Sequence, residues 1–221
     1  NDIVCSIKNV MKKGTQVSLV VGGGNIWRGR YAKPEMDRTK ADQIGMLATV
    51  INSIYLADVF RRNNIKAIVM TPFIVATMTE QFSKEKALEY MEKGYIVIFA
   101  GGVGHPFFST DTIPALRAAE LEADCVLVAK NVDGIYDKDP SQFKDAIRYK
   151  EITYRKVIKD NLVANDITAM ILCENNNIES LVFALNYPKS IELACEDSEE
   201  FYKFGTKIVF NNEEDYYVKW N

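Results

Sequence analysis

Two glycine-rich stretches carry residue types that bind phosphate groups in proteins. Residues 22–24 are three glycines with Arg28 shortly after them, and residues 101–104 hold three more glycines, ahead of helix-capping types at 109–111. Backbone amides at glycine turns and helix N-termini favour an anion, and an arginine can make a forked contact to a phosphate. The pattern therefore predicts a phosphate-binding site. The alternatives are that the glycines serve only the turns and that Arg28 forms a surface salt bridge.

Three further polar side chains are candidates for binding a nucleotide. Asp42 can accept a hydrogen bond from a sugar hydroxyl, Tyr136 can stack on a base, and Asp139 can accept from a ribose or an amino group. Each has a simpler interpretation. Asp42 can be a carboxylate in the first turn of a helix, where the helix dipole favours it, and residues 130–140 can be an ordinary polar loop.

The elements that would position these residues alternate between strands and helices. Short apolar runs at 17–21, 95–100 and 125–129 each precede one of the candidate loops and are predicted to be buried strands. Further strands are predicted at 65–70, 180–184 and 205–210, and helices at 2–13, 41–62, 83–93, 112–123, 153–157 and 165–174. This rhythm is typical of an α/β fold with a parallel sheet, in which ligands bind at the carboxyl ends of the strands.

The helix predicted at 41–62 has apolar residues on most of its sides. Such a helix is typically buried inside a domain or in a subunit interface. Because closed symmetric assembly is the usual way to bury an apolar face, the sequence favours a homo-oligomer.

Composition limits the class of protein. The 221 residues contain no repeat, low-complexity tract or linker, so a single domain is predicted. A net charge of -3 gives no indication of a nucleic-acid or membrane partner, and the apolar runs fall short of a membrane span. The four cysteines are widely spaced and the one histidine is His105, which argues against a zinc site or a serine–histidine hydrolase and favours a reduced, cytosolic protein.

Five segments carry a resemblance to a known family. They are VVGGGNIWRG, ADQIGMLATVIN, FAGGVGHPFFSTDTIPALRAAE, AKNVDGIYDKDP and NDITAMILCENN. In order and spacing the chain resembles the bacterial uridylate kinases of the amino-acid-kinase family, over about residues 18–183. The resemblance implies a three-layer αβα sandwich around a mainly parallel sheet, forming one domain over 1–221. It also implies transfer of the γ-phosphoryl group of ATP to UMP, giving UDP in pyrimidine nucleotide biosynthesis, by a cytoplasmic homohexamer.

The resemblance also assigns site residues. The residues that would bind UMP are Gly22, Asp42, Val103, Gly104, His105, Pro106, Phe107, Phe108, Ser109 and Thr110. The residues that would bind ATP are Gly23, Arg28, Lys130, Asn131, Tyr136 and Asp139, with Mg2+ carried by the nucleotide and no metal ligand from the protein. The catalytic residues would be Arg28 and Asp166, the latter orienting a phosphate-binding lysine. Residues 165–168 are mostly capping types, so the simpler interpretation of Asp166 is helix capping.

The chain departs from the family pattern at several places. Val103 and His105 stand where threonine and asparagine are usual, which bears on acceptor preference. No strand with the motif K-x-S-G, whose lysine and glycine loop bind the ATP phosphates, precedes Asp2, so we expect the natural polypeptide to extend ahead of Asn1. Two other functions stay open: a nucleotide-binding regulatory protein without catalysis, and a relative that acts on a small carboxylate or carbamate.

Overall fold

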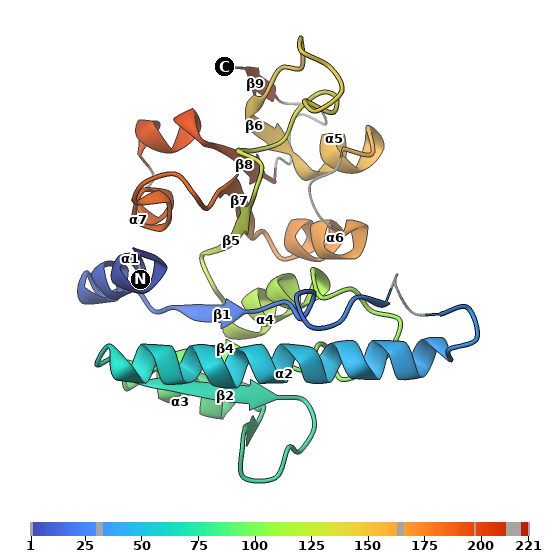
Figure 1. Cartoon of the computed structure of the whole chain (residues 1–221). Coiled ribbons are helices and arrows are strands. Elements are labelled where there is room, and N and C mark those ends of the chain that lie inside the picture. The colour runs from blue at the N-terminus through green and yellow to red at the C-terminus, as the bar shows by residue number, and fades with distance from the viewer. Residues whose placement is uncertain (1, 30–32, 163–165, 197, 211–217, 221) are drawn as a thin grey trace. The chain divides into compact units, whose positions relative to one another are not determined.

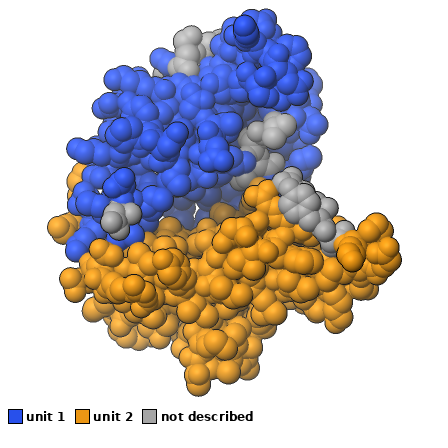
Figure 2. All heavy atoms as spheres, in the orientation of Figure 1, with its two compact units in different colours: residues 1–10, 115–221 blue, residues 11–114 orange. Residues whose placement is uncertain are grey.

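Figure 1 shows the computed structural model, which describes residues 2–29, 33–162, 166–196, 198–210 and 218–220. The chain forms two compact units, which Figure 2 shows in different colours. Unit 1 comprises residues 1–10 and 115–221, and unit 2 comprises residues 11–114. Each unit has its own sheet, so the two are described separately.

Unit 2 is built on an all-parallel sheet. Its strands, in spatial order, are β1 (Ser18–Val20), β4 (Ile96–Phe99), β2 (Ala67–Thr71) and β3 (Glu80–Gln81). Helix α2 (Arg38–Arg62) packs on β2 and β4, and helix α3 (Lys84–Glu92) packs on β4. All residues of β4 are buried, as expected for a parallel strand whose two faces are both covered.

Unit 1 is built on a mixed sheet. Its strands, in spatial order, are β5 (Cys125–Lys130), β7 (Glu179–Ala184), β8 (Gly205–Val209), β6 (Tyr149–Thr153) and β9 (Val218–Trp220). The pairs β5–β7 and β6–β8 are parallel, whereas β7–β8 and β6–β9 are antiparallel.

Helices cover both faces of the unit 1 sheet. Those of one face are α4 (Thr112–Leu121), α5 (Tyr154–Lys159) and α6 (Ile167–Asn175), and those of the other are α7 (Ser190–Cys195) and the 3-10 helix η2 (Glu199–Lys203). Because successive side chains of a strand point to opposite faces, Val182 of β7 packs in the first cluster, while Leu181 and Phe183 pack in the second. Unit 1 therefore has three layers, with the sheet in the middle.

The first helix, α1 (Asp2–Lys12), follows from the spacing of its apolar residues. Val4, Ile7 and Val10 recur at helical intervals and are buried. Gly14 ends the helix with a φ of +93°, and its N–H donates to the carbonyl of Met11 at 3.0 Å.

The α/β class and the predicted strands and helices are confirmed, with two corrections. The strands predicted at 17–21 and 125–129 are not fully buried, because among the described residues β1 and β5 each lie at the edge of their sheet and pair with one strand. The long helix begins at Arg38 rather than at residue 41, because the side chain of Asp37 caps it by accepting from the N–H of Lys40.

Candidate functional site

In unit 2 the two glycine-rich loops start side by side. Strands β1 and β4 are parallel and Val20 lies opposite Phe99, so both loops leave the same edge of the sheet. A Cβ added to Gly23 would lie 2.8 Å from Ala48 Cβ and 3.0 Å from the nitrogen of Thr49. The first loop therefore lies against a segment of small residues in α2, and this close approach requires glycine.

The second loop needs glycine for its backbone conformation as well. Gly101, Gly102 and Gly104 have φ values of +81°, +65° and +88°, which L-residues with a side chain rarely adopt. The N–H of Gly101 donates to Thr49 Oγ1 at 2.8 Å in a buried position, and a Cβ there would lie 2.8 Å from the Phe73 ring. Thr49 thus fixes the start of the second loop on the helix that the first loop touches.

Two polar side chains make hydrogen bonds to the first loop. Asn52 of α2 donates to the carbonyl of Gly22 at 2.7 Å and to Asn25 Oδ1 at 2.7 Å. Arg28 donates through Nε to the carbonyl of Gly24 at 2.8 Å. For the terminal nitrogens of this exposed arginine, the described residues provide no hydrogen-bond partner. They are available to an anion such as a phosphate.

Asp42 joins the helix to the loop at 103–110. Its carboxylate accepts from Arg38 Nε at 2.9 Å on both oxygens and from the backbone N–H of Phe107 at 2.9 Å. Because α2 starts at Arg38, Asp42 lies beyond the first turn, and its interpretation as a first-turn carboxylate is wrong. A carboxylate offers about four acceptor positions, so Asp42 retains capacity for a sugar hydroxyl.

The loop at 103–110 presents aromatic side chains to solvent. Phe107 and Phe108 are 67% and 57% exposed, and Phe107 has a φ of +71°, which is rare for a bulky residue. Val103 is half-buried and His105 is exposed. Ser109 Oγ accepts from the N–H of Asp111 at 3.2 Å, just before α4 begins. The loop therefore offers apolar rings and backbone groups together, a combination suited to a planar base.

The remaining predicted residues lie in unit 1, at the end of β5. Lys130 is the last residue of the strand and Asn131 follows it. The phenol of Tyr136 donates to Asp133 Oδ1 at 2.8 Å. Burial, and then this hydrogen bond, raise the pKa of Tyr136 to about 12, so the phenol keeps its proton near neutral pH.

The carboxylate of Asp139 accepts hydrogen bonds from residues that directly follow it in the chain. Its Oδ1 accepts from the N–H and hydroxyl of Ser141 at 2.9 and 2.6 Å, and its Oδ2 accepts from Gln142 at 2.9 Å. The hydrogen bonds from Ser141 lower the pKa of this carboxyl. A contact from Asp139 to a ribose or an amino group would have to add to these bonds or replace them.

Asp166 is the N-cap of α6. Its Oδ1 accepts from the N–H of Thr168 at 3.3 Å, so the capping interpretation is confirmed and the catalytic role stays a prediction. Asn165, the other capping type at this helix start, lies outside the described residues.

Several contacts around these loops involve residues that the sequence analysis did not single out. Thr49 and Asn52 hold the glycine loops, and Arg148 and Thr206 hold the loop after β5. The available signal for Thr49 and Asn52 was their polarity on a mostly apolar helix. No local pattern marks Arg148 or Thr206.

Comparison with known proteins identifies the family. The model of the amino acid kinase family matches residues 1–184. A UMP kinase from Bacillus anthracis is 35% identical with a TM-score of 0.90, over 99% of this chain and 88% of that chain. A UMP kinase from Ureaplasma parvum is 38% identical with a TM-score of 0.87, over 94% and 87%. A uridylate kinase from Archaeoglobus fulgidus is 25% identical with a TM-score of 0.72, over 94% and 91%.

Proposed function

We propose that this chain, which belongs to the amino acid kinase family, transfers the γ-phosphoryl group of ATP to UMP and gives UDP in pyrimidine nucleotide biosynthesis. The likeness to two UMP kinases at 35% and 38% identity over nearly the whole chain carries this proposal. The convergence of two glycine loops on α2 supports it independently, because phosphoryl transfer relies on positioning and charge neutralisation by such groups.

The proposed UMP-binding residues all lie in unit 2, whereas the proposed ATP-binding residues come from both units. In unit 2, Gly22, Asp42 and residues 103–110 bind UMP, and Gly23 and Arg28 contact the phosphates of ATP. The ATP-binding residues of unit 1 are Lys130, Asn131, Tyr136 and Asp139. The support is that the unit 2 residues lie on loops that leave the same edge of one sheet, and that the unit 1 residues lie on the single loop after β5. The two units together form one amino-acid-kinase domain, a proposal supported by the family match across residues 1–184.

Mg2+ enters with the nucleotide in this proposal. Among the described residues, no group of three or more histidine, cysteine, aspartate and glutamate side chains is placed to hold a metal ion. Magnesium in kinases is held largely by substrate phosphates and water, with one or two carboxylates, so a protein cage is not required. When bound to ATP, the ion neutralises charge on the phosphates.

A coupled assay of ADP formation tests the proposal. The acceptors are UMP, CMP, dUMP and N-acetylglutamate, with a reaction that contains no acceptor as the blank. We expect kcat/KM to be highest for UMP by a wide margin, because a site that pairs with a base edge and a ribose hydroxyl rejects analogues that leave its groups unpaired. Activity on the acid alone would instead indicate a carboxylate kinase. ATP binding without any transfer would indicate a regulatory protein.

Asp166→Asn is the matched active-site variant for this assay. Asparagine caps a helix as well as aspartate does, so the fold and the KM for UMP should change little. We expect kcat to fall about 100-fold if the charge acts in the transition state. An unchanged kcat would leave Asp166 with its capping role alone.

We also propose that the chain assembles into a homo-oligomer, a hexamer made of dimers, through α2. Ile44, Leu47, Ile51 and Tyr55 recur at helical intervals along α2 and are 39%, 51%, 57% and 68% exposed. A second copy of this stripe is self-complementary and would bury it. Light scattering should give a multiple of the 25.0 kDa chain mass, and Ile51→Asp should lower it. The control is Ile147→Asp, at a 48% exposed position of unit 1, and a 25.0 kDa particle for the unaltered protein would contradict the proposal.

The protein is proposed to be cytoplasmic. The four cysteines, all in the described part of the chain, form no disulfide, which suits a reducing compartment. Within that part of the chain, one helix, α2, is long and apolar enough to cross a membrane. This finding is weak evidence for a span, because core helices of soluble proteins pass the same test, and α2 packs on β2 and β4.

A further inference from the structure

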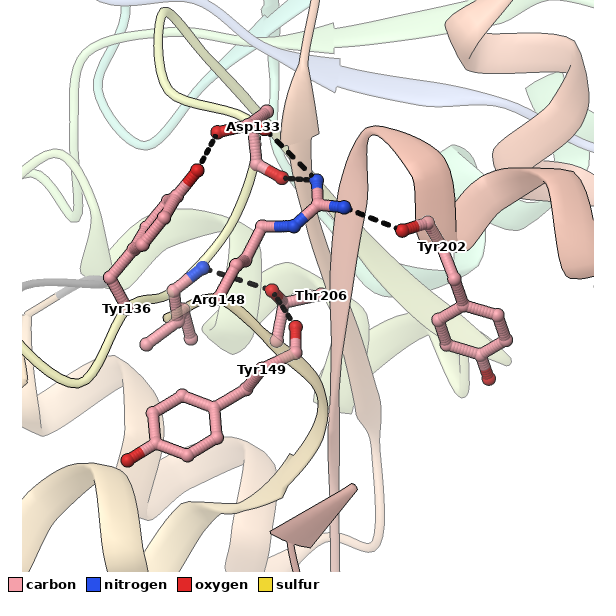
Figure 3. Close-up of polar contacts among 7 residues, drawn as sticks. Asp133, Tyr136, Arg148, Tyr149, Tyr202 and Thr206 are labelled. Carbon is pink, nitrogen blue, oxygen red and sulfur yellow. Dashed lines mark hydrogen bonds and ion pairs between the residues drawn. The ribbon is translucent and has the colours of Figure 1, made fainter. Parts of the chain in front are cut away.

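A nearly buried arginine supports the loop that follows β5. Arg148 immediately precedes β6 and its side chain is only 9% exposed. Figure 3 shows its polar contacts. One terminal nitrogen donates to the carbonyl of Asp133 at 2.6 Å and to Asp133 Oδ2 at 3.1 Å, and the other donates to the carbonyl of Tyr202 at 2.6 Å. A single guanidinium thus ties the loop to the segment that leads into β8.

Asp133 links Arg148 to Tyr136, because its carboxylate accepts a hydrogen bond from each of them. Its Oδ2 accepts from Arg148, while its Oδ1 accepts from the phenol of Tyr136 at 2.8 Å (Figure 3). The backbone is paired as well, because Tyr136 and Arg148 form an antiparallel bridge and the N–H of Tyr149 donates to the carbonyl of Ile135 at 2.9 Å. The position of the Tyr136 ring is therefore set at its backbone and at its hydroxyl.

The loop also rests directly on β8. Thr206, which is fully buried, accepts from the N–H of Ile135 at 2.9 Å and donates to the carbonyl of Tyr149 at 2.6 Å. Gly134 has a φ of +145°, and a Cβ there would overlap Thr206 Oγ1 and lie 2.8 Å from Arg148 Cδ. Glycine at position 134 therefore allows the backbone of the loop to pack directly against Thr206 and Arg148.

We infer that Arg148 is a positioning residue for the ATP side of the reaction: acting through Asp133, it holds Tyr136 in the orientation in which its ring meets the adenine of ATP. This inference rests on the proposed function. Arginine suits the task better than lysine, because its planar fork reaches two carbonyls and a carboxylate at fixed angles. A loop ordered before the nucleotide arrives loses less conformational entropy on binding, so the contact should act on ATP affinity rather than on the chemical step.

The test compares Arg148→Met with the unaltered protein. The measurements are kcat, the KM for ATP, the KM for UMP, the Kd for ATP by calorimetry and the melting temperature. We expect the KM and Kd for ATP to rise about tenfold, while kcat and the KM for UMP stay within about twofold. Arg155→Met is the control, because Arg155 is a 53% exposed residue of the same unit that pairs with Glu174. A lower melting temperature with unchanged ATP constants would show a structural role only and overturn the inference.

Two further variants test the intermediate step. Asp133→Asn keeps the size of a 43% exposed side chain and removes the ion pair, so it is informative even if Arg148→Met does not fold. It should also raise the Kd for ATP, and an unchanged Kd would overturn the inference. Tyr136→Phe removes only the hydroxyl and should raise the Kd about threefold. Because the residues act in series, adding Tyr136→Phe to Arg148→Met should raise the Kd no further, and fully additive effects would contradict the series.

The readouts separate this inference from the proposed function. Calorimetry with ATP does not depend on the acceptor. If the protein does not phosphorylate UMP but Arg148→Met still weakens ATP binding, the proposed function fails and the inference stands. If the protein is a UMP kinase and Arg148→Met binds ATP as tightly as the unaltered chain, the inference fails alone.

Discussion

The loop after β4 and the loop after β5 are held in place by different means. In the first, residues 103–110 expose two phenylalanines and are held to α2 by the carboxylate of Asp42, itself near the surface. In the second, Gly134 leaves no room for a side chain, and the buried Arg148 and Thr206 bind its backbone.

This difference indicates that the two loops have different functions. A loop with few buried contacts opens at a low free-energy cost, which suits a segment that must enclose a substrate. A loop fixed by buried hydrogen bonds is pre-organised, which suits a site for a nucleotide that always binds in the same way. Substitutions in the loop after β5 should therefore mainly affect stability and ATP binding, and those in the loop after β4 should mainly affect acceptor binding.

The largest effect is expected from Gly134→Ala. The new methyl group would overlap Thr206 Oγ1, and the backbone has a φ of +145°. We expect the free energy of unfolding to fall by about 3 kcal/mol, measured by urea denaturation. Gly22→Ala is the control from the first glycine loop, because a Cβ there meets nothing within 4 Å. Equal stability of the two variants would contradict the proposed rigidity of the loop after β5.

Thr206→Val tests the same support without a steric clash. Valine keeps the shape of threonine but leaves the buried N–H of Ile135 and carbonyl of Tyr149 without this partner. We expect a loss of about 2 kcal/mol in the free energy of unfolding and faster hydrogen exchange at the amide of Ile135. Unchanged exchange at that amide would show that the loop does not depend on Thr206.

Asp42→Asn tests the loop after β4. Asparagine keeps the size of the side chain but loses the charge that pairs with Arg38. The hydrogen bond that the side chain accepts from the N–H of Phe107 is therefore weakened. We expect the KM for UMP to rise about tenfold and the KM for ATP to stay unchanged. Asp58→Asn is the control, because it breaks another aspartate–arginine pair, with Arg62, four residues apart on the same helix. A rise in the KM for ATP after Asp42→Asn would remove the assignment of this loop to the acceptor.

Local patterns were sufficient to predict the glycine loops and most of the strands and helices, but β3, β6, β9, α7 and η2 were not predicted. Apolar runs of four to six residues mark β2, β4 and β7, because each is shielded on both faces. The burial of β1 and β5 was predicted wrongly, because a single sequence does not show which strand lies at the edge of a sheet. The start of α2 was placed at residue 41 instead of Arg38, because Asp37 and Asp42 are both plausible near a helix N-terminus.

The supports of the loops could not be predicted in the same way. Arg148 meets Asp133 and Tyr202 across 15 and 54 residues, and Thr206 meets Ile135 across 71. Such contacts depend on the order of strands in the sheet, which periodicity does not encode. The sequence did predict Tyr136 as a candidate for stacking, but it gave no reason for the orientation of its ring.

The smallest effect is expected from the titration of Tyr136. Burial, followed by the hydrogen bond to Asp133, raises the pKa of its phenol to about 12. The protonated phenol is therefore favoured in the folded chain, and its contribution to stability is complete below the unfolded pKa of about 10 and is lost as the pH rises towards 12. Tyr136→Phe cannot titrate at this position. The difference in free energy of unfolding between the unaltered chain and Tyr136→Phe should thus shrink between about pH 10 and 12, while other tyrosines titrate in both proteins and cancel. A difference that stays constant over this range would show that the hydroxyl of Tyr136 is not held as Figure 3 shows, and would remove one of the contacts by which the loop after β5 is fixed more firmly than the loop after β4.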